Sequence, residues 1–231
     1  MIRKIVFGVI VIVLFNSTLL SAQSIGGSFM LGFPQGEFKE KVDRVGYGFQ
    51  LHGTLWSPGS LQPFTIGANF GYMIYGEETR TSQLSPTIPD IGVEVNRSNS
   101  IVNFNLLFQI CPFPGPVKPY LEGLFGGAYI FTKTSVESEW SDEPVFESTN
   151  FDDWTWNYGA GAGILIRISE GIGDFGNLYL DLKARYLFGS EAEYLREGDI
   201  IIDQTTGDLT YNISRSKTDL FKLYIGVVAA M

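Results

Sequence analysis

Leu-Tyr-Leu-Asp-Leu-Lys-Ala-Arg-Tyr-Leu-Phe, residues 178–188, is the stretch that decides the fold. Side chains on a β-strand alternate between its two faces, so one face of this stretch is apolar and the other carries Asp181, Lys183 and Arg185. A ribbon with two such faces needs an apolar partner on one side only. That partner is either a protein core or a lipid bilayer.

The same alternation recurs along the rest of the chain, with turn-forming residues between the runs. Eight runs cover residues 25–33, 46–56, 64–75, 102–110, 120–131, 154–167, 178–188 and 221–231. The connections between them are residues 34–45, 57–63, 77–96, 112–119, 133–153, 169–177 and 189–217, which alternate between long and short. The prolines of 112–119 indicate a turn, because proline removes a ladder donor inside a sheet.

Four features of these runs favour lipid as the partner of the apolar face. The runs exceed the roughly 5–6 residues usual in soluble sheets and match the roughly 9–11 that a tilted strand needs to cross a bilayer. The alternation of short and long connections is typical of membrane barrels. Glycines crowd the polar face, as in Gly159, Gly161 and Gly163, where a narrow interior needs small residues. Aromatic residues gather near run ends, as in interfacial girdles.

The sequence therefore predicts an all-β fold, an eight-stranded antiparallel up-and-down transmembrane β-barrel with short periplasmic turns and long extracellular loops. The polar face would then line the interior. A soluble secreted barrel with the faces reversed is the competing fold.

The first residues have the features of a secretory signal peptide. Arg3 and Lys4 precede an apolar stretch at residues 5–15, and a small residue, Ala22, stands at the expected cleavage position. We predict a cleaved signal peptide at 1–22 and one barrel domain at 23–231. The single cysteine, Cys111, allows no internal disulfide.

The charge balance excludes nucleic acid as a partner. The chain has 16 basic and 25 acidic residues, a net charge of −9. Without Arg3 and Lys4 the mature chain keeps 14 basic against the same 25 acidic residues, which gives −11. No basic patch for phosphates is present.

The signal peptide, the eight alternating runs and the alternating apolar residues of the last run resemble the small outer-membrane β-barrels of Gram-negative bacteria, the OmpA-like and OmpX-like group. The resemblance covers residues 23–231 and concerns pattern rather than a catalytic motif. It implies localisation in the bacterial outer membrane, contact with outer-membrane lipids and lipopolysaccharide, and recognition of the C-terminal strand by the barrel-insertion machinery. Those proteins typically end in an aromatic residue, whereas Met231 stands here.

The inward face of the predicted barrel collects charged and polar residues. We predict a lumen polar network of Glu122, Arg167, Asp181, Lys183, Arg185, Lys222, His52 and Gln50, accompanied by Asn69, Asn103, Asn105, Gln109 and Asn157. Charges inside so narrow a lumen must be paired or hydrated. An ion-pair plug that fills the barrel is the main interpretation, and a narrow channel for small solutes or ions is the alternative.

His52 is the only histidine and thus the only candidate for histidine-based acid–base chemistry. Eight-stranded lipid-modifying enzymes of the outer membrane use a histidine with a serine and a carboxylate. Parity places His52 inward, away from lipid, and no serine nucleophile motif is near it.

Two connections stand out as surface features. Residues 133–153 form a predicted acidic surface loop with Glu137, Glu139, Asp142, Glu143, Glu147, Asp152 and Asp153, which lacks the spacing of an EF-hand. Residues 189–217 contain alternating stretches that suggest a strand extension or hairpin above the membrane. Such a loop is a surface for an extracellular partner that the sequence does not identify.

These observations predict a non-enzymatic integral outer-membrane protein, with the barrel as a scaffold and long surface loops for contact or binding. A channel is the first alternative and a lipid-modifying enzyme the second. The sequence shows no motif for a cofactor or a metal.

Overall fold

The computed structural model describes residues 24–58, 62–85, 88–138, 141–171, 176–202 and 209–230. The predicted signal peptide, residues 1–22, and Met231 lie outside the described residues. Among the residues that the structure describes, no helix has the length and apolar composition needed to cross a membrane.

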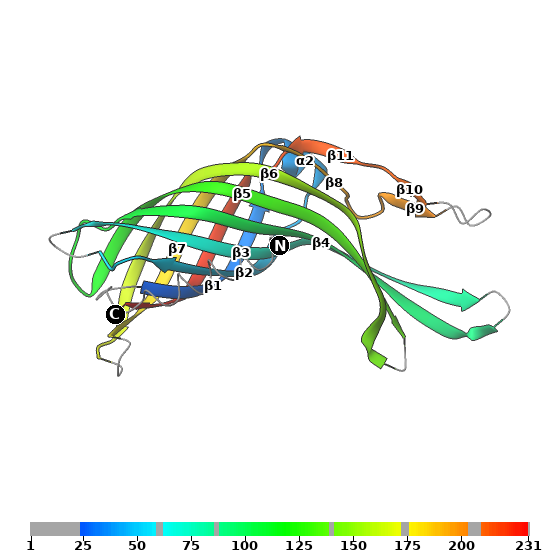
Figure 1. Cartoon of the computed structure of the whole chain (residues 1–231), viewed down its shortest axis with the longest axis horizontal. Helices are drawn as coiled ribbons and strands as arrows, with labels where there is room; N and C mark the ends of the chain where they lie inside the picture. Colours follow the sequence, from blue (N-terminus) through cyan, green and yellow to red (C-terminus); the bar gives the residue numbers. More distant parts are fainter. Residues whose placement is uncertain are drawn as a thin grey trace, which may run out of the picture.

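Eight strands form one closed antiparallel barrel (Figure 1). They are β1 (Ser24–Pro34), β2 (Gly46–Thr54), β3 (Phe64–Ser85), β4 (Ile88–Ile110), β5 (Val117–Ser138), β6 (Ser141–Ser169), β7 (Asn177–Gly189) and β12 (Leu220–Ala230). Each strand pairs with its neighbour in sequence, and β12 closes the ring against β1 in a register that runs from Ser24 opposite Ala230 to Pro34 opposite Leu220. Closure leaves no open edge, which a bilayer requires. The predicted barrel is confirmed.

The two faces of the wall point as the alternation predicts. In β4, Phe104 is 54% exposed, whereas its neighbours Asn103 and Asn105 are 3% and 1% exposed. In all eight barrel strands the outward side chains include large apolar ones that are fully or partly exposed, such as Ile25, Phe49, Phe70, Leu121, Trp156, Leu182 and Ile225. An exposed apolar belt around a closed barrel is suited to lipid and not to water.

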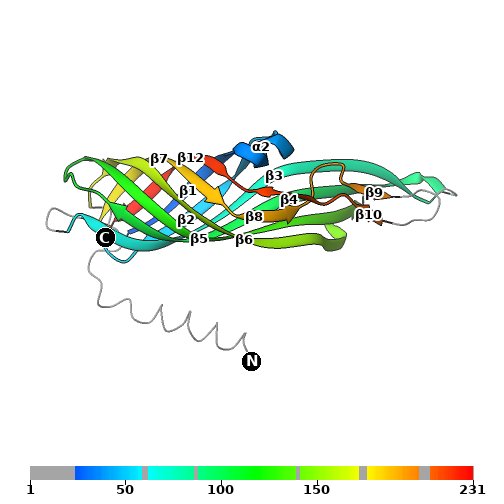
Figure 2. The ribbon, with the colours of Figure 1, turned by 90° about the horizontal axis from the view of Figure 1, so that it is seen from above.

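Strands β3 to β6 are longer than expected. Residues 77–96 and most of 133–153 were predicted as connecting loops, but β3 pairs with β4 out to Ser85 opposite Ile88, and β5 pairs with β6 out to Ser138 opposite Ser141. Beyond the lipid both faces of a strand are hydrated, so polar residues can continue a ladder without alternation. Figures 1 and 2 show these strands continuing well past the barrel on one side.

Smaller elements cover the same end of the barrel. Helix α2 (Gly36–Lys41) lies in the connection between β1 and β2. The segment between β7 and β12 contains β8 (Glu191–Tyr194), β9 (Ile200–Ile202), β10 (Leu209–Tyr211) and β11 (Ser214–Lys217). β8 pairs with β11 and β9 with β10, so the predicted hairpin structure in residues 189–217 is confirmed.

The opposite end carries the short turns and the first and last described residues. We take it as the periplasmic end, because short turns face the periplasm in bacterial barrels. One detail of these turns differs from the expectation: Pro119 was assigned to the turn at 112–119, but β5 begins at Val117, and Pro119 faces Ile164 of β6.

Apolar side chains fill the extracellular half of the interior. Met30, Met73, Ile101 and Ile130 project from the wall, and Phe38 of α2 packs on them from above. The rings of Phe38 and Tyr194 meet edge to face with centroids 5.2 Å apart. This cluster separates the extracellular mouth from the polar middle of the barrel.

Candidate functional site

The middle of the barrel interior is built around a buried ion pair between β7 and β5. Arg185 donates from Nε and Nη2 to the two carboxylate oxygens of Glu122, with 3.0 Å between Nη2 and Oε2. Its Nη1 donates to Oε1 of Gln50 on β2, 2.5 Å away. The guanidinium also lies 4.9 Å from the ring centroid of Tyr224. One arginine therefore ties four strands together across the lumen.

A second ion pair lies next to it on the same face of β7. Lys183 Nζ donates to Oδ2 of Asp181 at 2.8 Å, and the Tyr120 hydroxyl donates to Oδ1 at 2.6 Å. All three side chains are buried. Because Asp181, Lys183 and Arg185 stand two residues apart on one strand, the period of the strand places all three in the lumen.

Lys222 of β12 has an amide as its partner and not a carboxylate. Its Nζ donates to Oδ1 of Asn103 at 2.6 Å. Nearby, Asn105 donates from Nδ2 to Oδ1 of Asn157. Several buried polar atoms of the described residues have no protein partner; these are Ser28 Oγ, Gln50 Nε2, His52 Nδ1, Asn69 Oδ1, Asn105 Oδ1 and Asn157 Nδ2.

Arg167 does not join this network, and its predicted place there is wrong. It lies at the periplasmic end of β6, where its Nη2 is 2.8 Å from Oε1 of the exposed Glu170. The alternation gave its face correctly, but the position along the barrel axis puts it beyond the enclosed part of the lumen. The glycines of the same strand make room for other residues: a Cβ on Gly161 would meet Arg185 and Glu122 at 2.8 Å, and one on Gly163 would meet Tyr120 at 2.4 Å.

His52 is enclosed in the lumen. Its ring lies against Gly26 on the neighbouring strand, where a Cβ would come within 2.4 Å of Cε1. In the described part of the chain its Nδ1 has no hydrogen-bond partner. The ring therefore does not face lipid, and no carboxylate is hydrogen-bonded to Nδ1 to orient it. An acid–base histidine requires such an orienting partner.

Two small cavities lie among these groups in the part of the barrel that the structure describes. One of about 30 Å³ lies between the ion pairs and the periplasmic turns, lined by residues that include His52, Glu122 and Asp181. Another of about 10 Å³ lies near Asn103 and Asn157. The smaller has room for about one water and the larger for about two or three. The smaller is itself lined by members of the apolar cluster, among them Ile101 and Ile130. This filling favours the ion-pair plug over the channel.

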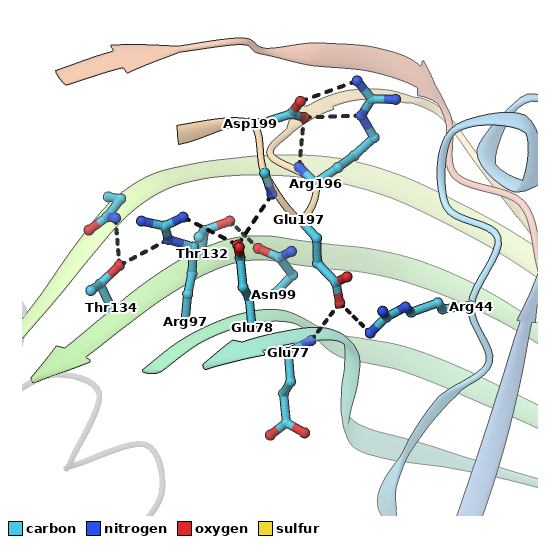
Figure 3. Close-up of polar contacts among 12 residues, drawn as sticks. Arg44, Glu77, Glu78, Arg97, Asn99, Thr132, Thr134, Arg196, Glu197 and Asp199 are labelled. Atoms are coloured by element: carbon cyan, nitrogen blue, oxygen red, sulfur yellow. Dashed lines mark hydrogen bonds and ion pairs between the residues drawn. The ribbon is translucent and has the colours of Figure 1, made fainter. Parts of the chain in front are cut away.

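The extracellular mouth carries a polar assembly that the sequence analysis missed (Figure 3). The turn after β8 docks on the rim of the barrel through Glu197, whose Oε1 accepts from Arg44 Nη1 at 2.5 Å and from the backbone N of Glu77 at 3.1 Å. The backbone N of Gly198 donates to Oε2 of Glu78 at 3.2 Å, and Arg97 lies 3.5 Å from the same oxygen.

The turn itself is stabilised by Arg196 and Asp199. Arg196 donates from its backbone N and from Nε to Oδ2 of Asp199, at 2.9 and 3.0 Å. These hydrogen bonds raise the pKa of the Arg196 guanidinium. The spacing of Arg196 and Asp199 was a local signal for this turn, but the partners at Arg44, Glu77 and Glu78 are far away in sequence and carry no such signal.

Of the predicted acidic loop, Asp152 and Asp153 have described side chains, whereas those of Glu137, Glu139, Asp142, Glu143 and Glu147 lie outside the described residues. Asp153 accepts from the backbone N of Trp154 and of Glu193, both at 2.8 Å, and so fastens β8 to β6. Within the side chains that the structure describes, no group of three or more His, Cys, Asp or Glu is arranged to hold a metal ion.

A closed eight-stranded ladder with an apolar exterior and a charged, plugged interior defines a small transmembrane β-barrel of the bacterial outer-membrane class. This agrees with the resemblance and the localisation predicted from the sequence. No protein-family model and no curated protein sequence matches the chain.

Three solved structures are similar to it in fold. Neisserial surface protein A has a TM-score of 0.43 at 12% identity over 90% of this chain and 98% of that chain. Ail, the attachment invasion locus protein of Yersinia pestis, was solved with the heparin analogue sucrose octasulfate. Its TM-score is 0.37 at 11% sequence identity, over 91% of this chain and 98% of that chain. A major outer membrane protein from Thermus thermophilus has a TM-score of 0.47 at 13% sequence identity, over 90% of this chain and 99% of that chain.

Proposed function

We propose that this protein is a non-enzymatic outer-membrane scaffold whose extracellular sheet makes contact with a partner outside the cell. The observation that carries the proposal is the continuation of β3, β4, β5 and β6 beyond the barrel as paired strands. Four strands in one ladder form a broad, rigid surface that a plugged barrel does not need for its own stability.

Where its side chains are described, the extension is polar on the side that is apolar in the barrel. Glu77, Thr79 and Thr149 are exposed on it, whereas the outward residues of the same strands inside the belt include Phe70 and Trp156. The apolar belt contacts outer-membrane lipids and lipopolysaccharide. The barrel-insertion machinery recognises β12. The exposed polar sheet remains for an extracellular partner.

The absence of catalysis is part of the proposal. His52 is enclosed in the lumen, and the buried carboxylates Glu122 and Asp181 are held by Arg185 and Lys183. Groups locked in ion pairs inside a filled barrel are not placed to reach a lipid or a soluble substrate.

The register defines truncations that test the proposal without opening the barrel. Thr79 faces Asn96, and Thr134 faces Ser148, so residues 80–95 and 135–147 can each be replaced by a two-residue Asn-Gly turn. Cells that display the wild-type protein are compared with cells that display the doubly truncated one for retention on surfaces coated with extracellular-matrix proteins and for self-association.

We expect the truncation to reduce retention and self-association to the level of cells without the protein. The barrel must still insert, which heat-modifiable gel mobility of the detergent-extracted protein shows. A replacement in the periplasmic turn at residues 112–116 is the matched control and should leave retention unchanged. The proposal is contradicted if cells with the truncated protein are retained as well as cells with the wild-type protein. It is also contradicted if cells with the wild-type protein are retained no better than cells without it.

A further inference from the structure

The extracellular mouth holds a pocket of about 260 Å³, far larger than either cavity in the lumen. The end of α2 and the connection that follows it form one wall, with Lys41 and Arg44. The turn after β8 forms the opposite wall, with Glu197, and the floor is made by Tyr75, Gly76 and Asn99. We call it the mouth pocket. Ligand pockets for drug-sized molecules begin at about 300 Å³, so its occupant would be somewhat smaller.

A β-bulge shapes the floor of the mouth pocket. The register of β3 against β4 shifts between Ile74 and Gly76, so Tyr75 is the extra residue. Bulges redirect side chains and are common beside binding sites. Gly76 keeps the floor open: a Cβ there would lie 3.0 Å from Asn99 Nδ2 and 3.5 Å from Glu197 Oε1. The absence of a side chain leaves a space bordered by a donor and an acceptor.

Asn99 supplies a donor without a protein partner. Its side chain is nearly fully buried, and its Oδ1 accepts from the Thr132 hydroxyl at 2.7 Å. That bond fixes the amide so that Nδ2 is directed to the pocket side, and no described residue accepts a hydrogen bond from it. Asn99 lines the mouth pocket, so an oxygen of a ligand seated there can accept the hydrogen bond of this N–H.

Charge indicates the rest of the ligand. The pocket is lined by three cations, Lys41, Arg44 and Arg196, and by the carboxylates of Asp43 and Glu197. Arg44 is paired with Glu197 and Arg196 with Asp199, whereas none of the described ion pairs involves Lys41. The Arg44 side chain is 61% exposed and reaches the pocket from its rim. Cations select a carboxylate, and the two acids are acceptors for hydroxyl groups.

We propose that the mouth pocket binds a single acidic sugar unit, a hydroxylated ring that bears one carboxylate. The carboxylate lies toward Lys41 and Arg44, a ligand oxygen accepts from Asn99 Nδ2, and hydroxyl groups donate to Asp43 and Glu197. This site deepens the proposed contact function and depends on the mouth being extracellular.

The test is calorimetric titration of the purified full-length barrel in detergent micelles with D-glucuronate, and with D-glucose as the neutral counterpart. We expect saturable one-site binding of glucuronate and binding of glucose at least about tenfold weaker, because a charge-assisted hydrogen bond is lost.

Two variants test the assigned contacts. Asn99→Asp keeps the acceptor for Thr132 but replaces the Nδ2 donor by an anionic oxygen, and Lys41→Ala removes an exposed cation without touching the core. Each should weaken glucuronate binding by about tenfold or more. Arg215→Ala is the control, since it removes a cation that pairs with Glu191 at 2.8 Å outside the pocket, and its affinity should stay within about twofold of wild type.

The proposal is overturned if the wild-type protein shows no saturable glucuronate binding, if glucose binds equally well, or if Lys41→Ala binds glucuronate as tightly as wild type. If Asn99→Asp fails to insert, Lys41→Ala alone decides. The protein shortened at 80–95 and 135–147 keeps every pocket residue, so glucuronate binding in that protein separates the failure of the pocket from the failure of the contact function.

Discussion

Arg185 and Glu122 face each other across the barrel interior in a doubly hydrogen-bonded pair, with Arg185 Nη2 3.0 Å from Glu122 Oε2. Both side chains are almost completely removed from solvent, at 1% and 2% exposure. Gln50 and Tyr224 hold the same guanidinium from two other strands. The pair thus links strands that are not adjacent in the ladder.

Glu122→Gln should destabilise the barrel by about 3–5 kcal/mol, because it leaves the Arg185 guanidinium buried without its counter-charge. The midpoint of urea unfolding in detergent measures the change. Glu170→Gln is the matched control: it removes the same charge from the exposed Arg167–Glu170 pair and should cost no more than about 1 kcal/mol. Equal midpoints for the two variants would show that the lumen pair is not structural.

A charge placed in the apolar belt should impair the barrel, whereas the same charge above the membrane should not. Ile225→Arg puts a cation in the middle of β12 and is expected to cost about 2–4 kcal/mol. Ile213 lies outside the barrel strands and has similar exposure, 47% against 53% for Ile225. Ile213→Arg should leave heat-modifiable mobility and the unfolding midpoint unchanged. Tolerance of both substitutions would mean that lipid does not cover β12.

Gly163, on the lumen face of β6, should not accept a methyl group. A Cβ on Gly163 would lie 2.4 Å from Cζ of Tyr120, whose ring is fixed by its hydrogen bond to Asp181. We expect Gly163→Ala to cost about 1–3 kcal/mol through overpacking, measured as a lower unfolding midpoint. Gly123→Ala provides the comparison, because its Cβ would meet nothing within 4 Å. If both variants unfold at a lower midpoint than wild type, the loss comes from reduced flexibility of the strand and not from lack of space beside Tyr120.

Alkaline pH should loosen the packing of β8 and β11 at the mouth. Burial raises the pKa of the Tyr194 hydroxyl, which shares a 2.7 Å hydrogen bond with Ser216. The unfolded state therefore releases this proton first, so the contribution of Tyr194 is complete below its ordinary pKa of about 10 and falls as pH rises toward the raised value.

Denaturation at several pH values measures this effect. At neutral pH, Tyr194→Phe should be less stable than wild type by about 1 kcal/mol, the value of one hydrogen bond. Above the ordinary pKa of tyrosine the two midpoints should approach each other. A difference that stays constant with pH would contradict the assignment.

The period of two made the barrel predictable from the sequence. In every barrel strand the side chains assigned to the polar face point inward, among them Asp181, Lys183 and Arg185, because the alternation is a direct consequence of strand geometry. Arg167 shows the limit of this reasoning. Parity fixes the face of a residue but not its height along the axis, and height decides whether it is enclosed.

The mouth could not be predicted in the same way. The extensions of β3 to β6 are mostly polar in sequence, and apolar alternation is confined to short stretches such as Ile91, Val93 and Val95, which are too short to identify a strand in lipid. The contacts of Glu197 with Arg44 and with the backbone of Glu77 join three segments whose proximity depends on the register of the strands and on the docking of the turn. None of these is a local property of the chain.

The continuation of four wall strands into the extracellular sheet has a mechanical consequence. A force applied to the outer part of the sheet meets no loop in the described strands between the extension and the wall. The ladder from Val93 opposite Ser82 to Ser100 opposite Ile74, with its bulge at Tyr75, carries the force into the barrel wall. The load is then shared as shear among many parallel hydrogen bonds and reaches the surrounding lipid through the apolar belt. The protein is in this sense a rigid lever anchored in the membrane.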